Sequence, residues 1–159
     1  MTQPTDKRIS LRAVTPDDGE LLLEVYAAAR AIEVAMMPWD DAEKEVFLRQ
    51  QLGAQTAFYT AEFPTATHDI VLFEGQPAGR IYVERGRDLI KILDIAILPQ
   101  FRRNGIATVL IMDLTKEARP VRVSVESFNP SQKLFNDLGF AVVANDSVNI
   151  VFERTPAEK

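Results

Sequence analysis

Cysteine is absent from the 159-residue sequence, and histidine occurs once, as His68. The lack of cysteine excludes a disulfide scaffold, a thiolate metal site and a cysteine nucleophile. One histidine is too few for a histidine-rich metal centre, so we expect no metal site. It also leaves His68 as the single residue that could be the base of a serine–histidine triad. His68 precedes an apolar stretch, and we expect it to be structural or exposed rather than catalytic.

Positive charge and long apolar runs are also scarce. Lys and Arg number 18 against 23 Asp and Glu, which gives a formal net charge of −5 and a pI near 5.0. No basic surplus exists to neutralise a nucleic-acid backbone, so we expect no nucleic-acid partner. No apolar run approaches the ~20 residues of a membrane span, and residues 1–8 lack the apolar core of a signal peptide. We therefore expect a cytoplasmic protein with no membrane partner.

The rest of the composition is that of an average globular domain, with 47% hydrophobic and 26% charged residues. A chain of this length buries roughly 68–70% of its unfolded surface, which is enough for a real core. We predict one domain over residues 1–159, with an ordered core over about residues 8–154. The ends, residues 1–7 and 155–159, are polar and contain proline, so we expect both to be loose.

Period-two alternation and turn residues predict seven strands, and apolar stripes at helical spacing predict four helices. The predicted strands cover residues 9–14, 68–74, 78–85, 89–98, 121–125, 140–144 and 148–153. The predicted helices begin after Thr15, after Asp40 or Asp41, after Gly105 and after Asn129. The apolar body of the first helix covers residues 21–32. Residues 57–67 do not indicate clearly either a helix or a strand.

The resulting order, βααβββαβαββ, indicates an α+β or mixed α/β fold. An antiparallel meander occupies the middle of the chain. The strand–helix–strand unit over residues 89–125 adds one pair of parallel strands. The sheet is therefore predicted to be mixed, mostly antiparallel, and flanked by helices.

The last helix carries distinct signals at both ends. Asn129 is the predicted cap, Pro130 takes the first position, and Gln132 is placed to reach back as in a capping box. Gly139 is expected to end the helix in the left-handed region, with Phe140 packed back onto it.

The segment most informative about chemistry follows the strand that ends at Pro99. A short basic loop with Arg102 and Arg103 leads to Gly105, where a helix begins. The free amides of a helix start, the helix dipole and the arginines together suit a pyrophosphate. The alternative is that Gly105 only starts the helix and the arginines are solvated. The spacing matches neither a P-loop nor a dinucleotide fingerprint.

Two motifs in this half of the chain resemble the GCN5-related N-acetyltransferase (GNAT) family, the acyl-CoA-dependent GNAT fold. Residues 102–107, Arg-Arg-Asn-Gly-Ile-Ala, fit the family's Gln/Arg-x-x-Gly-x-Gly/Ala signature, and residues 97–99 supply the hydrophobic-x-Pro before it. The second motif is an Asn-led helix that ends in Gly-Phe, here Asn129 to residues 139–140. The element order is similar to that of the family over residues 9–154.

The resemblance implies that acetyl-CoA binds between two strands that splay apart. Backbone amides of residues 102–107 would hold its pyrophosphate, and residues 95–98 would pair with the pantetheine arm. An amide near Ile97 would stabilise the oxyanion of the reaction. The implied cofactor-binding residues are Ile95, Ala96, Ile97, Leu98, Arg102, Arg103, Asn104, Gly105, Ile106, Ala107, Thr108, Asn129, Lys133 and Phe135.

Direct acetyl transfer needs a neutral amine and a base that takes its proton. Asp94 is the first candidate, because it interrupts an apolar strand beside the expected thioester. Glu126, at the end of the following strand, is the second. Asp94 could instead face water, or pair with Lys91 or an arginine.

The general acid is where the sequence departs from the family. Many members have a tyrosine in the helix after the position of Asn129, and here the residue is Phe135, which cannot donate a proton. Another hydroxyl could substitute, from Tyr82, Tyr59 or Ser127. Water could instead protonate the thiolate, or the domain could bind acetyl-CoA and catalyse poorly.

The resemblance implies an acyltransferase that moves an acetyl group from acetyl-CoA to a primary amine by direct attack in a ternary complex. The acceptor would be a small molecule or a peptide. The alternative is a non-catalytic acyl-CoA-binding or sensor domain, supported by the phenylalanine at position 135. A third interpretation is a mixed α/β interaction module with no CoA site.

The acceptor would lie against the two N-terminal helices. Residues 36–39, Met-Met-Pro-Trp, could form one wall or pack in the core. Glu33 and Asp40 could attract an amine or be ordinary surface acids, and Tyr26 is expected in the core. The closing hairpin over residues 140–153 could pair across a homodimer.

Overall fold

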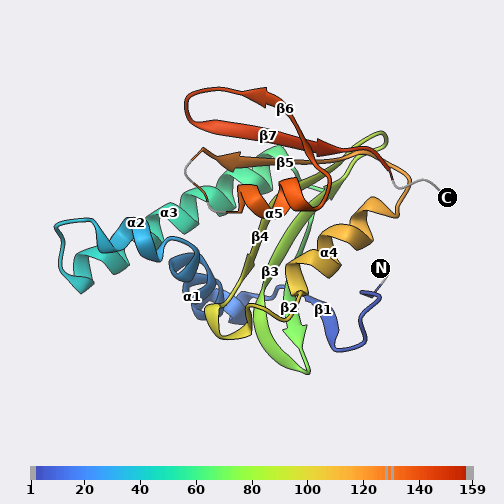
Figure 1. Ribbon diagram of the computed structural model, residues 1–159. Helices are drawn as coiled ribbons and strands as arrows, with labels where there is room; N and C mark the ends of the chain where they lie inside the picture. The colour runs from blue at the N-terminus through green and yellow to red at the C-terminus, as the bar shows by residue number, and fades with distance from the viewer. Residues whose placement is uncertain (1–2, 128, 130, 157–159) are drawn as a thin grey trace.

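The computed structural model describes residues 3–127, 129 and 131–156 (Figure 1). Its centre is a seven-stranded sheet in the order β1-β2-β3-β4-β5-β7-β6. The strands are β1 (Ile9–Ala13), β2 (Thr67–Phe73), β3 (Gln76–Arg85), β4 (Ile90–Ile97), β5 (Val121–Glu126), β6 (Ala141–Asn145) and β7 (Asn149–Arg154). Every neighbouring pair is antiparallel except β4 and β5, which are parallel. The predicted mixed sheet is therefore confirmed.

The N-terminal helices differ in part from the prediction. They are the 3-10 turn η1 (Pro16–Asp18), α1 (Gly19–Ala29), α2 (Ala31–Ala35) and α3 (Asp41–Glu62). Thr15 and Asp40 both form capping boxes, as their residue types favour. The single helix expected through residue 32 is wrong, because the backbone leaves the helical region at Arg30 (φ −112°, ψ 12°) and α2 begins separately.

The stretch without a clear signal, residues 57–67, belongs mostly to α3. The helix runs on to Glu62 and stops at Phe63, the residue before Pro64. A proline disfavours helical geometry in the residue before it, so the sequence itself sets this end. The length of α3 brings aromatic side chains from its second half over the sheet.

The C-terminal half contains the 3-10 turn η2 (Pro99–Phe101), α4 (Ile106–Thr115) and α5 (Gln132–Asp137). Gly139 ends α5 at φ +86°, and the Phe140 amide donates to the Phe135 carbonyl at 3.0 Å. The ring centroids of these two phenylalanines are 5.3 Å apart. The predicted helix end is confirmed.

The predicted start of α5 is wrong in detail. Ser131 occupies the N-cap position, and Asn129 stands two residues before it, where its Oδ1 accepts from the Ser131 amide at 2.8 Å. The Gln132 side-chain amide donates to the carbonyl of Ser127 and completes no capping box. The Asn129 side chain closes a turn of its own, so the helix begins later. The expectation for Pro130 lies outside the described residues.

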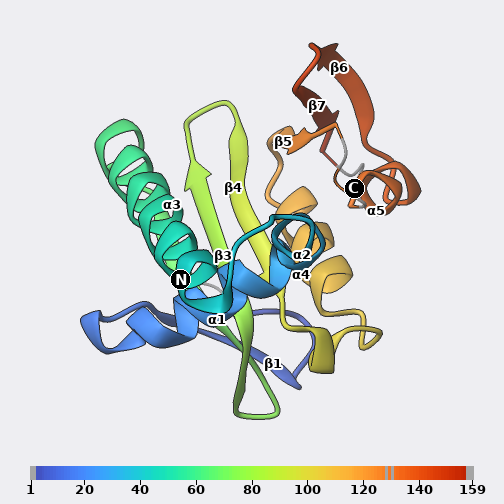
Figure 2. The same cartoon turned by 90° about the vertical axis from the view of Figure 1, so that its left-hand side faces the viewer.

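The helices form layers on both faces of the sheet. Figure 2 shows α3 on one side of β3 and β4 and α4 on the other. Residues 90, 92, 121 and 123 are buried in the main core, which includes α4 and α5, so the alternate residues 91, 122 and 124 face the α3 side. A register shift between the partners of Val83 and Tyr82 puts residue 94 on that side too. Among the helices that the structure describes, none is long and apolar enough to cross a membrane.

The N-terminal segment is better anchored than expected. The Thr5 amide and hydroxyl both donate to the Asp113 carboxylate on α4, at 3.0 and 2.9 Å. The side-chain amide of Gln3 exchanges hydrogen bonds with the backbone of Leu11. Residues 3–7 are therefore tied to the fold, whereas residues 1, 2 and 157–159 lie outside the described part.

Candidate active site

The parallel strands β4 and β5 stay together for only three residue pairs, which end at Ile92 and Val123. Beyond this point β4 turns away, while β5 stays paired with β7 through Glu126. The divergence begins at a bulge, where Leu93 is an extra residue between the partners of Val83 and Tyr82. A bulge bends and twists its strand, which explains why the two strands separate here.

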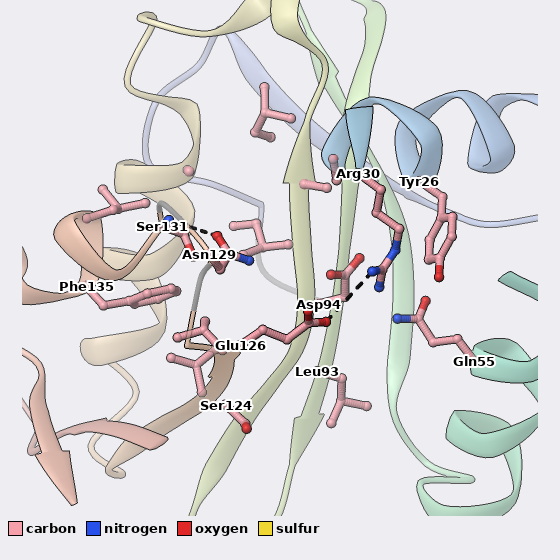
Figure 3. A pocket seen from close by; sticks show the side chains of 18 of the residues that line it. Tyr26, Arg30, Gln55, Leu93, Asp94, Ser124, Glu126, Asn129, Ser131 and Phe135 are labelled. Carbon is pink, nitrogen blue, oxygen red and sulfur yellow. Dashed lines mark hydrogen bonds and ion pairs between the residues drawn. The ribbon is translucent and has the colours of Figure 1, made fainter. Parts of the chain in front are cut away.

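A cavity of about 510 Å³ opens in the splay. Its far wall comes from α1 and α3, and residues of α2, α4 and α5 complete the lining (Figure 3). The lining residues are Tyr26, Ala29, Arg30, Glu33, Gln55, Tyr59, Leu93, Asp94, Ile95, Ala96, Ile97, Arg102, Ala107, Val123, Ser124, Val125, Glu126, Asn129, Ser131, Leu134 and Phe135.

The splay leaves backbone groups of β4 facing the opening. The Leu98 amide donates to the Ala78 carbonyl at 2.7 Å, which places residues 98, 96 and 94 in hydrogen-bonded positions toward β3. Antiparallel pairs alternate, so the N–H and C=O groups of Ile95 and Ile97 point to the opposite edge, toward the splay. The Ile97 carbonyl accepts from Arg102 Nε at 3.3 Å, and the remaining groups offer an extended ligand a strand edge to bind.

The close approach of β3 to β4 depends on Gly79. A Cβ at this position would lie 2.1 Å from the Ala96 carbonyl oxygen. Only glycine fits at that distance, and the contact fixes the strand whose free edge lines the cavity. We did not predict this role, although an isolated glycine within a strand is a signal of close backbone approach.

The loop before α4 leaves backbone amides without intrahelical partners at the start of the helix. Gly105 is the N-cap of α4 at φ +72°, and Arg103 also has a positive φ of 68°. The Val109 amide donates to the Gly105 carbonyl at 3.0 Å, so the amides of residues 106–108 precede the first intrahelical bond. The Asn104 side chain donates to the Phe101 carbonyl at 2.9 Å, which joins the end of η2 to the residue before Gly105. These amides and the helix dipole favour a bound phosphate.

The cofactor-binding residues expected from the sequence divide into two groups. Those that line the cavity are Ile95, Ala96, Ile97, Arg102, Ala107, Asn129 and Phe135. Those outside its lining are Leu98, Arg103, Asn104, Gly105, Ile106, Thr108 and Lys133. Leu98 and Ile106 are buried in the fold, and Lys133 is exposed and pairs with Asp137 at 3.0 Å. The lining also includes Ser131 and Leu134, which the sequence analysis did not select.

Asp94 lies in the cavity and is held by a buried arginine. Its Oδ2 accepts from Arg80 Nε at 2.6 Å, and Arg80 Nη2 donates to Gln55 Oε1 at 2.6 Å. Arg80 is 1% exposed, so its charge is compensated inside the protein rather than by water. The alternative of an arginine partner for Asp94 is therefore the arrangement found, and Arg80 itself was missed.

Glu126 reaches across the splay from β5 toward the end of α1 (Figure 3). Its Oε1 is 3.8 Å from Arg30 Nη1, and the same nitrogen is 3.7 Å from Glu33 Oε2. Both distances exceed that of a hydrogen bond. The Arg30 guanidinium also lies over the Tyr26 ring, 4.4 Å from its centroid. Glu126 is thus ion-paired with Arg30 without a hydrogen bond to it.

The rings of Tyr59, Tyr82 and His68 contact one another in that order, and Tyr82 pairs with Asp94 across β3 and β4. The Tyr59 hydroxyl donates to the Leu93 carbonyl at 2.8 Å, and burial raises the pKa of Tyr59 to about 12. Tyr82 lies between the edge of Tyr59 and the stacked ring of His68, with centroids 5.1 and 4.2 Å away. Tyr82 and Ser127 are not part of the cavity lining, whereas Tyr26, expected only in the core, is buried and also lines it.

Residues 36–39 do not line the cavity, and the core packing that was the alternative for them is not found either. Met36 is 82% exposed, and Trp39 packs on Phe47 of α3 with ring centroids 5.3 Å apart. The break between α1 and α2 directs this segment away from the splay. Glu33 does line the cavity, but Asp40 is occupied as the cap of α3.

A family model described as "Acetyltransferase (GNAT) domain" matches residues 33–156. The chain belongs to the GNAT acetyltransferase family. It is an acetyl-CoA-dependent N-acetyltransferase, as the two motifs predicted. A search of curated proteins finds no match.

Solved structures agree on the fold. A PaiA N-acetyltransferase from Thermoplasma acidophilum, in complex with coenzyme A, has a TM-score of 0.66 and 16% identity, covering 92% of this chain and 98% of its own. An acetyltransferase from Thermus thermophilus has a TM-score of 0.66 and 18% identity, over 92% and 96%. The ribosomal-protein-S18-alanine N-acetyltransferase of Escherichia coli has a TM-score of 0.61 and 14% identity, over 95% and 96%. The GNAT fold thus spans nearly the whole chain.

Proposed function

We propose that this GNAT protein transfers the acetyl group of acetyl-CoA directly to a primary amine within a ternary complex. The observation that carries the proposal is the splay of β4 and β5, whose cavity is lined by Arg102 and Ala107 beside the start of α4, by the edge of β4 and by the Glu126 carboxylate. Each of these features suits one part of the reaction.

The chain's backbone fits acetyl-CoA at two places. The amides that begin α4, together with Arg102, would hold the phosphates, because they combine unpaired N–H groups with positive charge. The edge of β4 at Ile95, together with the Ile97 amide, would bind the extended amide arm. When bound, acetyl-CoA supplies the thioester. The structure of relatives such as the PaiA enzyme with coenzyme A supports the fit of the fold.

Glu126 is our candidate for the general base. It lines the cavity, and the cation beside it, Arg30, is 3.8 Å away, so its oxygens are free to accept a proton. The amine nitrogen bonds to the acetyl carbon, the carbon–sulfur bond breaks with its electrons on sulfur, and the nitrogen's proton passes to Glu126. Positioned bases contribute about 10²–10⁴-fold to such reactions.

Asp94, our first candidate from the sequence, is better suited to positioning. One of its oxygens is already engaged by Arg80 at 2.6 Å, and Gln55 extends the network to α3. The network connects β3, β4 and α3 beside the splay. We therefore assign Asp94 the role of fixing the β4 edge and supplying fixed negative charge near the amine.

The leaving group needs no proton donor at position 135. Phe135 is 1% exposed and packs between Phe140 and Phe152, so it fills the core at the cavity wall. A thiol pKa of about 8.5 allows the sulfur to leave as its anion near neutral pH. Tyr59 is committed to the Leu93 carbonyl, and we assign protonation of the sulfur to solvent.

The experiment compares Glu126→Gln with Glu24→Gln, a matched change on the exposed face of α1. We expect Glu126→Gln to reduce kcat at pH 7 by at least about 10²-fold, with acetyl-CoA Kd within about twofold of wild type. Thiol release measures turnover against a panel of benzylamine, spermidine and N-terminal tripeptides. Loss below tenfold would contradict the role of Glu126. Tight acetyl-CoA binding with no transfer to any amine would favour the non-catalytic sensor instead.

A further inference from the structure

A second hollow, which we call the α3–β6 groove, continues from the active-site cavity. Its volume is about 620 Å³, and it lies between the second half of α3 and the strands β5, β7 and β6. Its lining residues are Phe58, Tyr59, Phe63, Lys91, Ile92, Leu93, Arg122, Ser124, Glu126, Val143, Ala144, Asn149 and Val151. Tyr59, Leu93, Ser124 and Glu126 line both spaces, so the groove opens at the proposed base.

The groove has apolar walls over a polar floor. Phe58, which is 57% exposed, and Phe63 form the α3 wall, and Val143 of β6 stands opposite. The floor includes Ser124 and Glu126, which share a face of β5 because alternate strand residues point the same way. An exposed aromatic wall beside an active-site opening suits a ligand with an apolar side group.

The charges in the groove are separated along its length. At the near end stands Glu126, with its cation 3.8 Å away. At the far end, Lys91 lies 5.4 Å from the Phe63 ring centroid, and in the described part of the chain it takes part in no ion pair. The positive charge of its neighbour Arg122 is compensated by Glu153, whose Oε1 accepts from Arg122 at 3.0 and 2.8 Å. The groove therefore has a negative end and a positive end.

The length between the two ends can be derived from strand geometry. Lys91 pairs directly with Arg122 across β4 and β5, and Glu126 is four residues further along β5. At about 3.3 Å per residue, the charged positions are about 13 Å apart along the strand. Three or four residues of an extended peptide cover about the same distance.

We propose that the acceptor is the N-terminus of a peptide with an acidic side chain near its third residue. This proposal rests on the proposed function, because Glu126 must face the reacting amine. The peptide's α-amine lies at Glu126, an apolar or aromatic second residue packs on Phe58 and Phe63, and the acid lies near Lys91. A polyamine is a poor acceptor here, because its second cation would meet the Lys91 ammonium.

The test uses three peptide amides that differ only in the third residue: Ala-Phe-Glu, Ala-Phe-Gln and Ala-Phe-Lys. The C-terminal amide removes the other negative charge. For wild type we expect kcat/KM to fall in that order, by about two- to fivefold at each step, as for a partly exposed charge pair. Spermidine should react more slowly than all three.

Two variants of Lys91 and one control test the assigned contact. Lys91→Gln should remove the preference among the peptides, and Lys91→Glu should invert it in favour of the lysine peptide. Lys7→Glu, a charge reversal on the exposed N-terminal segment, should leave the order unchanged. Melting temperatures of all variants report folding separately, and Lys91→Gln alone tests the charge if Lys91→Glu is unstable.

The outcomes separate this inference from the proposed function. Transfer to the peptides with no dependence on the third residue, or the same order in Lys91→Gln as in wild type, overturns the peptide assignment and leaves the enzyme intact. Faster transfer to spermidine than to any peptide also overturns it. If no amine of the panel is acetylated although acetyl-CoA binds, the failure belongs to the proposed function.

Discussion

Replacing Gly79 with alanine tests how the fold sets the geometry of the active site. A methyl group at this position would lie 2.1 Å from the Ala96 carbonyl oxygen and 3.0 Å from the Ile97 Cα. All of these atoms are backbone, so no side chain can rotate away. An ordinary contact needs about 3.4 Å or more, so β3 and β4 must separate by about 1 Å.

The expected size of the effect follows from this displacement. Overpacking a well-packed site costs about 1–3 kcal/mol. For a protein of this size, each kcal/mol lowers Tm by about 2–4 °C, so Gly79→Ala should lower Tm by roughly 2–12 °C. The shift also moves the Ile97 amide, which lines the cavity, and a misplacement of about 1 Å can cost about 10²-fold in rate.

Gly53→Ala is the matched control, because it adds the same methyl group inside α3. No heavy atom lies within 4 Å of the added Cβ, and alanine favours a helix over glycine by about 0.5–1 kcal/mol. Tm should therefore rise by a few degrees with unchanged activity. Thermal melts and kcat/KM for the acetyl acceptor measure both variants. Equal Tm for Gly79→Ala and wild type would refute the argument that this close contact positions β4.

Three further changes address other parts of the structure. Tyr59→Phe removes the hydrogen bond to the Leu93 carbonyl, and kcat/KM should fall by less than about tenfold, since such a bond contributes about 1 kcal/mol. A loss above 100-fold would instead identify Tyr59 as the general acid. Burial lowers the pKa of His68 from 6.5 to about 4. Between these pH values His68 is protonated in the unfolded chain but neutral in the folded chain, so lowering the pH favours unfolding. Wild type should therefore lose stability between pH 6.5 and 4 more steeply than His68→Gln in urea titrations, and equal slopes would contradict this. Phe135→Ala removes a ring that is 1% exposed and stacked on Phe152, and should cost about 3–5 kcal/mol, seen as a Tm lower by roughly 6–20 °C. A change below about 3 °C would show that the ring does not support the core.

The sequence was sufficient to predict the sheet and the loop before α4. Alternating apolar residues place all seven strands within a few positions of those found, because one face of each strand is buried. The start of α4 was predictable because a glycine follows the basic loop just before an apolar helical stripe, and Gly105 is the N-cap found.

What the sequence did not reveal depends on contacts between distant residues. The pairing of Arg80 with Asp94 and Gln55 joins three elements, and no local pattern identifies a buried arginine partner. The break at Arg30 also has no glycine or proline to announce it, so the first helix was extended too far.

A thermal-shift titration with acetyl-CoA, and with ATP as the control, tests most directly whether the splayed strands bind acetyl-CoA. At 100 times its Kd, a ligand adds about 2.7 kcal/mol, which corresponds to roughly 5–11 °C here. Gly105→Trp is compared with Gly75→Trp, since both glycines have a positive φ, +72° and +81°, and open space around the Cβ. We predict the full shift with acetyl-CoA for wild type and Gly75→Trp, little shift with ATP, and none with acetyl-CoA for Gly105→Trp. Equal acetyl-CoA shifts in the two variants, or no shift in wild type at millimolar acetyl-CoA, would contradict the assignment of the splayed strands and the Gly105 loop as the acetyl-CoA site.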